Sequence, residues 1–157
     1  MRIRDFRIGD EPVLWDVFFS AIHELAARDY SAEQVHAWAP ADMDRAAWAA
    51  RIRALQPWVA EHEGRVAGYA DLQPDGCIDH FFVSACHARQ GVGRALMEHL
   101  LRQARGRGLA ELAADVSRTA QPFFERFGFE VVEYRLPVRR GVAIPNARMR
   151  RVLPPGG

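Results

Sequence analysis

The chain has 157 residues, of which 49% are hydrophobic, which is enough to form the core of one globular domain. The 21 basic residues nearly balance the 20 acidic ones, and the net charge of +1 excludes a global field that attracts nucleic acid or anionic membranes. The two cysteines, Cys77 and Cys86, are too few for a disulfide framework. We therefore expect a single domain with reduced thiols.

The amino-terminal segment MRIRDFRIGDEP lacks the apolar stretch of a signal peptide. No run in the sequence approaches the roughly 18 apolar residues that are needed to cross a bilayer. We expect a cytoplasmic protein with no membrane partner. Residues 1–153 are expected to form the domain, and residues 154–157 a flexible tail.

The first third of the chain predicts one strand followed by helices. Side chains alternate along residues 1–8, and Gly9 and Asp10 end this strand. Apolar residues then recur three and four apart, which predicts an amphipathic helix over residues 11–28. The segments SAEQVHAW and DRAAWAARIRAL repeat this pattern in shorter helices on either side of Pro40.

Three apolar runs follow, separated by a Glu-Gly pair and an Asp-Gly pair that suit tight hairpin turns. They predict an antiparallel meander with strands at about residues 57–61, 65–72 and 77–84.

The last part of the chain predicts a helix over residues 91–105, a strand at LAELAADV, a short helix at TAQPFFERF and a strand at FEVVEYRL. A final strand is expected at about residues 141–150. The order β-α-α-β-β-β-α-β-α-β-β predicts an α+β domain. Its mixed, mostly antiparallel sheet of about seven strands is flanked by helices.

The segment HARQGVGRAL places two glycines directly before the helix over 91–105. Gly91 and Gly93 allow the backbone to approach an anion, and the first amides of the helix lack intrahelical partners, so this turn suits a phosphate. A plain tight turn explains the glycines equally well. The sequence lacks the GxxxxGK[ST] loop of nucleoside triphosphatases and the GxGxxG turn of dinucleotide-binding folds.

The segments IDHFFV, RQGVGRAL, LAELAADVS and AQPFFERFGFEVVE together resemble the coenzyme A half of the GNAT superfamily of N-acetyltransferases. The opening IRDFRIGDEPVLWDVF resembles the first strand and helix of that family. The resemblance covers most of the chain and implies acetyl-coenzyme A as cosubstrate, with no metal. It also implies direct attack of an amine on the thioester, without an acyl-enzyme intermediate.

The resemblance implies that backbone amides in the glycine turn hold the pyrophosphate, while the exposed edge of the preceding strand pairs with the pantetheine arm. The cofactor residues expected on this basis are Phe82, Val83, Arg89, Gln90, Gly91, Val92, Gly93, Arg94, Ser117, Phe123 and Phe124.

The chain departs from the family pattern at two positions. Ala88 stands where relatives carry a polar first residue of the turn, and Phe124 stands where many carry a tyrosine that protonates the leaving thiolate. A simple thiol has a pKa of about 8.5, so the missing acid forfeits only about 1 to 2 kcal/mol. Ser117 is the nearest alternative donor, and a helix cap is an equally good interpretation of that serine.

The candidate bases are Asp79 and His80, which lie in the strand beside the expected cofactor. Side chains alternate there, so one of the two is expected to face the cleft. An aspartate buried in that apolar strand requires a partner or a raised pKa, which suits a base, directly or through water. The alternative is a structural ion pair or hydrogen bond.

Glu24, Tyr30 and Trp38 lie in the region that covers the acceptor cleft in the family and are candidate acceptor-binding residues. Nearby carboxylates favour a cationic acceptor; they belong to Glu24, Asp29, Asp42 and Asp44. The alternative interpretation is core aromatics and ordinary helix surface.

Cys77, His80, Cys86 and His87 are spread over a strand and a loop, so we expect no zinc site. The basic stretches RQARGRG and ARMRR are accompanied by no nucleic-acid-binding motif, and we expect no nucleic-acid partner.

The sequence therefore predicts an acetyltransferase that acts on a primary amine of a small molecule or peptide. The alternative is a non-catalytic sensor or partner module that binds acyl-coenzyme A. The resemblance leaves a homodimer open.

Overall fold

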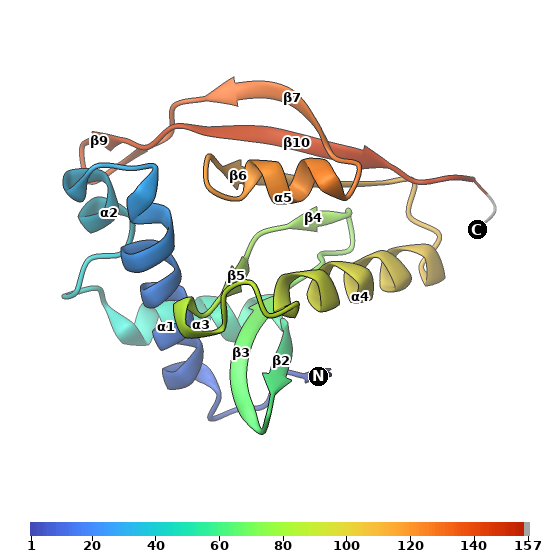
Figure 1. Ribbon diagram of the computed structural model, residues 1–157, viewed down its shortest axis with the longest axis horizontal. Helices are drawn as coiled ribbons and strands as arrows, with labels where there is room; N and C mark the ends of the chain where they lie inside the picture. The colour runs from blue at the N-terminus through green and yellow to red at the C-terminus, as the bar shows by residue number, and fades with distance from the viewer. Residues whose placement is uncertain (156–157) are drawn as a thin grey trace.

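The computed structural model describes residues 1–155 and divides most of its strands between two sheets (Figure 1). The first sheet is antiparallel and has the order β1 (Arg2–Asp5), β2 (Trp58–His62), β3 (Arg65–Ala70), β5 (Phe81–Val83). The second has the order β4 (Cys77–Ile78), β6 (Glu111–Ser117), β10 (Asn146–Val152), β7 (Glu130–Arg135). Strand β10 is antiparallel to both of its neighbours, and β4 is parallel to β6. The predicted α+β architecture is confirmed.

Helices cover both sheets. The helical elements are α1 (Glu11–Ser20), η1 (Ala21–Leu25), η2 (Ala26–Arg28), α2 (Ala32–Trp38), α3 (Arg45–Leu55), η3 (Ala85–His87), α4 (Val92–Gly106) and α5 (Gln121–Arg126). The helix predicted over residues 11–28 continues through its whole length, but it changes from α to a π-helical turn at η1 and to a 3-10 turn at η2. Such π turns are common beside functional sites.

The strand predicted over residues 77–84 is split into β4 and β5, which join different sheets. The buried carboxylate of Asp71 causes the break: its Oδ1 accepts the backbone N–H groups of Asp79 and His80 at 2.9 and 2.7 Å. Those two amides therefore turn toward a side chain instead of continuing a ladder. Before the break, β4 pairs with β6; after it, β5 pairs with β3, and the two sheets diverge.

The final strand begins at Asn146, later than the predicted residue 141, because a short hairpin precedes it. This hairpin consists of β8 (Val138–Arg139) and β9 (Val142–Ala143). Its two-residue turn, Arg140 and Gly141, has φ values of +50° and +76°, which match the twist of a tight hairpin. The predicted flexible tail includes residues 156–157, which lie outside the described part of the chain.

The core has two parts that meet along β3 and β5. One lies between α4, α5 and the second sheet, and includes Leu96, Leu100 and Met149. The other lies under α1 to α3 and includes Trp15, Ile52 and Tyr69. Within residues 1–155 we find no helix with the length and hydrophobicity to cross a membrane.

Candidate active site

A cavity of about 670 Å³ opens where the two sheets diverge. Its walls come from β5, the loop before α4, the first turn of α4, the end of β6 and helix α5. Ala21 and Leu25, at the two ends of the π-helical turn, complete the lining. We call this space the cofactor cavity.

One wall of the cofactor cavity is the unpaired edge of β5. The His80 carbonyl accepts a hydrogen bond from Asp71, and the Ser84 N–H donates to Ala67, so even-numbered residues turn their backbone groups toward β3. Backbone groups alternate along a strand, and those of Phe81 and Val83 therefore point away from β3. Strand β5 ends its sheet, so these groups face the cavity.

The amino terminus of α4 forms another wall. The first hydrogen bond of this helix runs from the Ala95 N–H to the Gly91 carbonyl, which leaves the amides of Val92, Gly93 and Arg94 without intrahelical partners. Gly91 has φ of +84°, a conformation that glycine adopts without strain. A Cβ at Gly93 would lie 3.3 Å from the Phe123 ring, so glycine also permits close packing there. The helix dipole favours negative charge at this end.

All but one of the expected cofactor residues line this cavity. The exception is Gln90, whose side-chain Nε2 donates to the Cys86 carbonyl at 3.2 Å. The Arg94 side chain is paired with Glu98 on the helix surface at 2.8 Å, and Arg94 is therefore better suited to contribute its backbone amide. Phe124 is 3% exposed and packs against Phe81.

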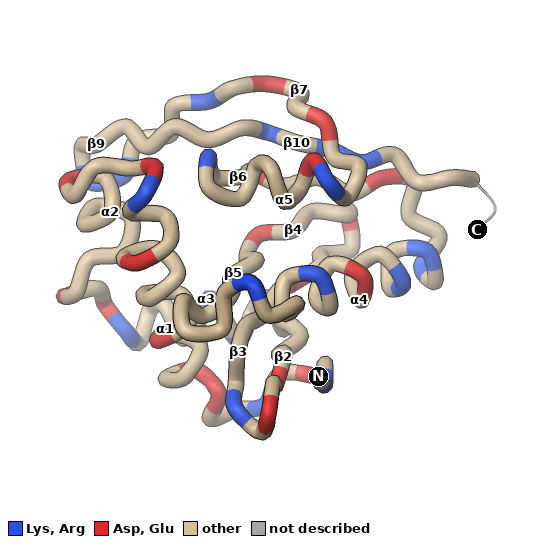
Figure 2. Tube along the Cα trace, viewed as in Figure 1, with Lys and Arg blue, Asp and Glu red and all other residues tan. Residues whose placement is uncertain are grey.

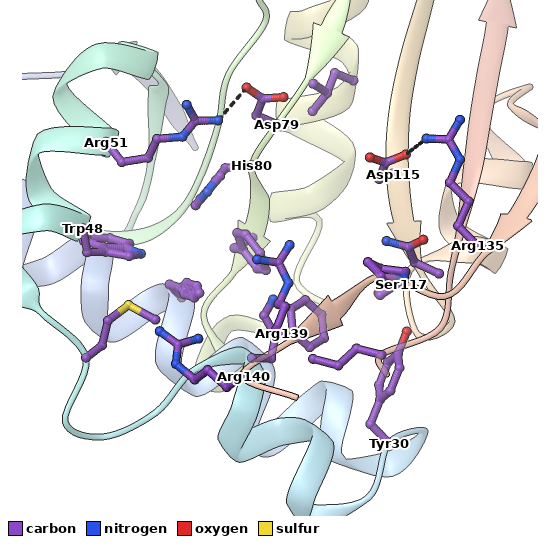
Figure 3. A pocket seen from close by; sticks show the side chains of 18 of the residues that line it. Tyr30, Trp48, Arg51, Asp79, His80, Asp115, Ser117, Arg135, Arg139 and Arg140 are labelled. Atoms are coloured by element: carbon purple, nitrogen blue, oxygen red, sulfur yellow. Dashed lines mark hydrogen bonds and ion pairs between the residues drawn. The ribbon is translucent and has the colours of Figure 1, made fainter. Parts of the chain in front are cut away.

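A second cavity, of about 620 Å³, lies on the other side of β5. Phe82 and Ser117 line both cavities, so the two spaces meet at these residues. We call the second space the acceptor cavity. In Figure 3, Arg51, Asp79 and His80 lie on one side of it and Asp115, Arg135 and Ser117 on the other, with Arg139 between them.

The His80 imidazole lines the acceptor cavity among aromatic rings. Its Nδ1 lies 2.9 Å from the Tyr69 hydroxyl, and its ring packs against Phe18 and Phe82. Burial, together with the nearby guanidinium groups of Arg51 and Arg139, lowers the pKa of His80 to about 4. His80 is therefore neutral at physiological pH.

The expectation that Asp79 is buried is wrong. Its side chain is 37% exposed at the rim of the acceptor cavity, and Oδ2 lies 3.2 Å from Arg51 Nη2. The buried acid of this region is Asp71, which the sequence reasoning missed. Burial raises the pKa of Asp71, although its carboxylate accepts hydrogen bonds from two backbone amides and Gln73.

The candidate acceptor residues have different positions. Tyr30 and Trp38 line the acceptor cavity, and their rings are 5.6 Å apart. The Tyr30 hydroxyl donates to the Pro145 carbonyl and accepts a hydrogen bond from the Arg118 N–H. These two bonds connect segments that are distant in the sequence. Glu24 is exposed and lines neither cavity.

The carboxylates expected to attract a cationic acceptor lie elsewhere. Asp29 accepts a hydrogen bond from Thr119, and Asp44 caps α3 by accepting the Ala47 N–H. Neither these two nor Asp42 line the acceptor cavity. The alternative interpretation, ordinary helix surface and caps, describes them correctly.

Both interpretations of Ser117 remain compatible with its position. Its Oγ accepts the Ala120 N–H at 3.1 Å, which stabilises the turn before α5. The hydrogen of the Ser117 hydroxyl takes no part in that bond and is free to donate where the two cavities meet.

Sequence reasoning missed the arginines of the acceptor cavity, namely Arg51, Arg135, Arg139, Arg140 and Arg148. For Arg139 and Arg140 the sequence does contain a signal: residues 138–142 hold an Arg-Gly pair between two valines, a pattern typical of a hairpin turn. Among the residues that the structure describes, no three His, Cys, Asp or Glu side chains are placed to hold a metal ion.

The GNAT acetyltransferase domain model matches residues 26–150. The chain belongs to the GNAT acetyltransferase family. It is 34% identical over 150 residues to the uncharacterized N-acetyltransferase YafP of Escherichia coli, covering 96% of this chain and 95% of that protein. The predicted family and enzyme class are thus confirmed.

Solved structures agree with this assignment. A GCN5-related N-acetyltransferase from Rhodopseudomonas palustris superposes with a TM-score of 0.91 and 31% identity, covering 97% of this chain and 95% of that one. The PaiA N-acetyltransferase from Thermoplasma acidophilum, solved in complex with coenzyme A, has a TM-score of 0.72 and 16% identity, covering 97% of this chain and 98% of that one. At that identity the PaiA likeness concerns the fold.

Proposed function

We propose that this protein transfers the acetyl group of acetyl-coenzyme A to a primary amine of a small molecule or peptide, by direct attack of the amine. The observation that carries the proposal is the meeting of the two cavities at Phe82 and Ser117. One cavity presents backbone donors to an anionic, extended ligand, and the other presents titratable side chains. A thioester at the junction is within reach of an amine from the acceptor cavity.

Acetyl-coenzyme A supplies an activated acyl group as a thioester. The unpartnered amides of Val92, Gly93 and Arg94 suit its pyrophosphate, and the open edge of β5 suits the amide-containing pantetheine arm. The coenzyme A complex of PaiA, which shares this fold, supports the assignment.

The backbone of β5 also polarises the reacting carbonyl. The Val83 N–H is fixed in a strand, points away from β3 and stands at the cavity wall. A preorganised amide at this place stabilises negative charge that develops on the carbonyl oxygen as the amine attacks.

Asp79 is the base of the proposed reaction, acting through water. A lysine-like amine has a pKa of about 10.4, so only about one molecule in a thousand is neutral at physiological pH. Asp79 Oδ1 has no partner in residues 1–155 and stands at the rim of the acceptor cavity, where it can receive the proton. His80, with a pKa of about 4, is a poor base and acts as a fixed hydrogen-bond donor.

The test measures binding and turnover separately. We expect acetyl-coenzyme A to raise the melting temperature, and thiol release to depend on an added amine. Asp79→Asn is expected to lower kcat at neutral pH at least tenfold, with less effect above the pKa of the amine. Asp42→Asn, at an exposed position outside both cavities, is the matched control.

The phenylalanine at 124 favours one other function, a module that binds acyl-coenzyme A without turnover. Binding without amine-dependent thiol release over a broad acceptor panel would support that function. If neither acetyl-coenzyme A nor coenzyme A stabilises the protein, the cofactor assignment itself is wrong.

A further inference from the structure

The acceptor cavity carries an excess of positive charge that the rest of the molecule does not share. Five arginines and two aspartates line it, although the whole chain has a net charge of only +1. The residues outside the cavity lining include 16 basic and 18 acidic side chains, and both signs are spread over the chain (Figure 2). The excess is therefore a property of this cavity.

Two of the arginines share one carboxylate. Arg135 and Arg148 lie 3.3 and 3.5 Å from the same oxygen of Asp115, and Arg148 also donates to the Cys77 sulfur. Arg51 is paired with Asp79. Each of the two aspartates of the cavity is thus ion-paired with at least one of these three guanidinium groups, and Oδ1 of Asp79 stays free for the proposed proton transfer.

Arg139 and Arg140 have no carboxylate partner among residues 1–155. Arg140 donates to the Ala37 carbonyl at 2.8 Å, a neutral acceptor. The Arg139 guanidinium forms no side-chain hydrogen bond or ion pair within the described chain and points into the cavity, as Figure 3 shows.

The hairpin that carries these arginines is held in place. Three hydrogen bonds attach it and the following residues to the segment over residues 30–38: Arg140 to the Ala37 carbonyl, Gln34 to the Ala143 carbonyl, and Tyr30 to the Pro145 carbonyl. Arg140 itself lies in the left-handed region, with φ of +50°, where arginine is uncommon. A backbone in this conformation is retained only where surrounding contacts fix it, as they do here.

We propose that the acceptor amine carries an anionic group, a carboxylate or a phosphate, and that Arg139 binds this group. This inference rests on the proposed acetyl transfer and defines its substrate class. A guanidinium offers paired N–H donors that match both anions. Cationic acceptors such as polyamines are disfavoured, because the two carboxylates of the cavity, Asp79 and Asp115, are already paired with arginines.

The experiment compares pairs of acceptors that differ in the anionic group. The pairs are O-phosphoethanolamine with ethanolamine, and β-alanine with β-alaninamide; 1,4-diaminobutane represents the cationic class. We expect kcat/KM for the anionic member to exceed that of its neutral partner at least tenfold in one pair, and that pair identifies the anion. Arg139→Gln is expected to reduce this ratio at least fivefold.

Arg150→Gln is the control, because Arg150 pairs with Glu111 and lines neither cavity; it should keep the wild-type ratio. Ratios near one in both pairs, faster turnover of 1,4-diaminobutane, or an unchanged ratio in Arg139→Gln would each overturn the inference.

Binding measured by saturation-transfer NMR on the protein saturated with coenzyme A separates this inference from acetyl transfer. It requires no turnover. Anionic probes that bind better than their neutral partners, with the difference lost in Arg139→Gln, support the anion site even if no thiol is released. Equal binding of both members of each pair contradicts the site even if acetyl transfer occurs.

Discussion

The Tyr69 hydroxyl lies 2.9 Å from Nδ1 of His80, and this contact determines which imidazole nitrogen carries the proton. Tyr69 is fully buried, and burial raises its pKa well above the usual value, so the phenol keeps its proton. His80 Nδ1 is the one hydrogen-bond partner of this buried phenol among residues 1–155, and a phenol that accepted from Nδ1–H would leave its own O–H unpaired, so we infer that the phenol donates to Nδ1. We therefore assign the His80 proton to Nε2, and His80 offers a donor to the acceptor cavity.

Tyr69→Phe tests this assignment. Loss of the phenol leaves Nδ1 without its partner, and we expect a loss of about 1 to 2 kcal/mol in the free energy of unfolding, measured in urea. Nitrogen-15 NMR of His80 should show the Nε2–H form in the wild type and a mixture of tautomers in the variant. Tyr134→Phe, at a tyrosine that is 72% exposed, should change neither. An Nδ1–H form in the wild type would contradict the assignment.

The pKa of His80 also predicts a pH dependence of stability. The folded pKa is about 4 and the unfolded value about 6.5, so between these values the unfolded chain binds more protons. The contribution of neutral His80 is fully present above about pH 6.5 and is lost as the pH falls toward 4. We expect the wild type to lose about 2 kcal/mol more than His80→Gln between pH 7 and pH 4.5.

The comparison with His80→Gln is needed because carboxylates titrate in the same interval. Burial raises the pKa of Asp71, so the contribution of this carboxyl to folding stability increases as the pH falls, opposite to that of His80. Asp71 is present in both proteins. Equal losses of stability in the two proteins would show that His80 titrates normally in the folded state.

The glycine turn can be tested with two glycines that share a conformation. Gly91 and Gly108 have φ of +84° and +68°, and nothing lies within 4 Å of a Cβ added at either position. Gly91→Ala and Gly108→Ala should therefore cost a similar free energy of unfolding, about 1 to 2 kcal/mol.

Only Gly91→Ala is expected to weaken acetyl-coenzyme A binding, at least fivefold by titration calorimetry, because Gly91 precedes the amides that face the cofactor cavity. Equal affinities of the two variants would favour the plain-turn interpretation of the glycines.

The sequence was sufficient for the elements whose signal is local. The periodicity of α4 and the position of Gly91 and Gly93 predicted where this helix begins, and that end lines the cofactor cavity; anion binding there stays a prediction. The resemblance placed Phe82, Val83 and Phe124 at the same cavity. These features depend on residues close together in the sequence.

Features that depend on distant residues were not predictable in this way. The split between β4 and β5 depends on a carboxylate eight and nine residues earlier, at Asp71, whose burial no local pattern reveals. The position of Arg139 depends on contacts between its hairpin and the segment over residues 30–38, more than 100 residues away in the chain. The acceptor side of the site therefore required the structure.

The remaining question of the proposed chemistry is which group protonates the leaving thiolate, because Phe124 has no hydroxyl. We predict that Ser117 supplies the proton where the two cavities meet, so Ser117→Ala should lower kcat up to about tenfold at pH 6.5. The loss should shrink at pH 9, above the thiol pKa of about 8.5, where the thiolate leaves without an acid.

Ser117→Ala also removes the hydrogen bond from the Ala120 N–H, and two further variants separate that loss from chemistry. Ser117→Thr keeps the hydroxyl and should retain activity. Adding Phe124→Tyr to Ser117→Ala introduces a phenol at the wall of the cofactor cavity and should recover kcat at pH 6.5 without recovering the melting temperature. An activity loss that is equal at both pH values, and that Phe124→Tyr does not relieve, would assign Ser117 to the turn alone.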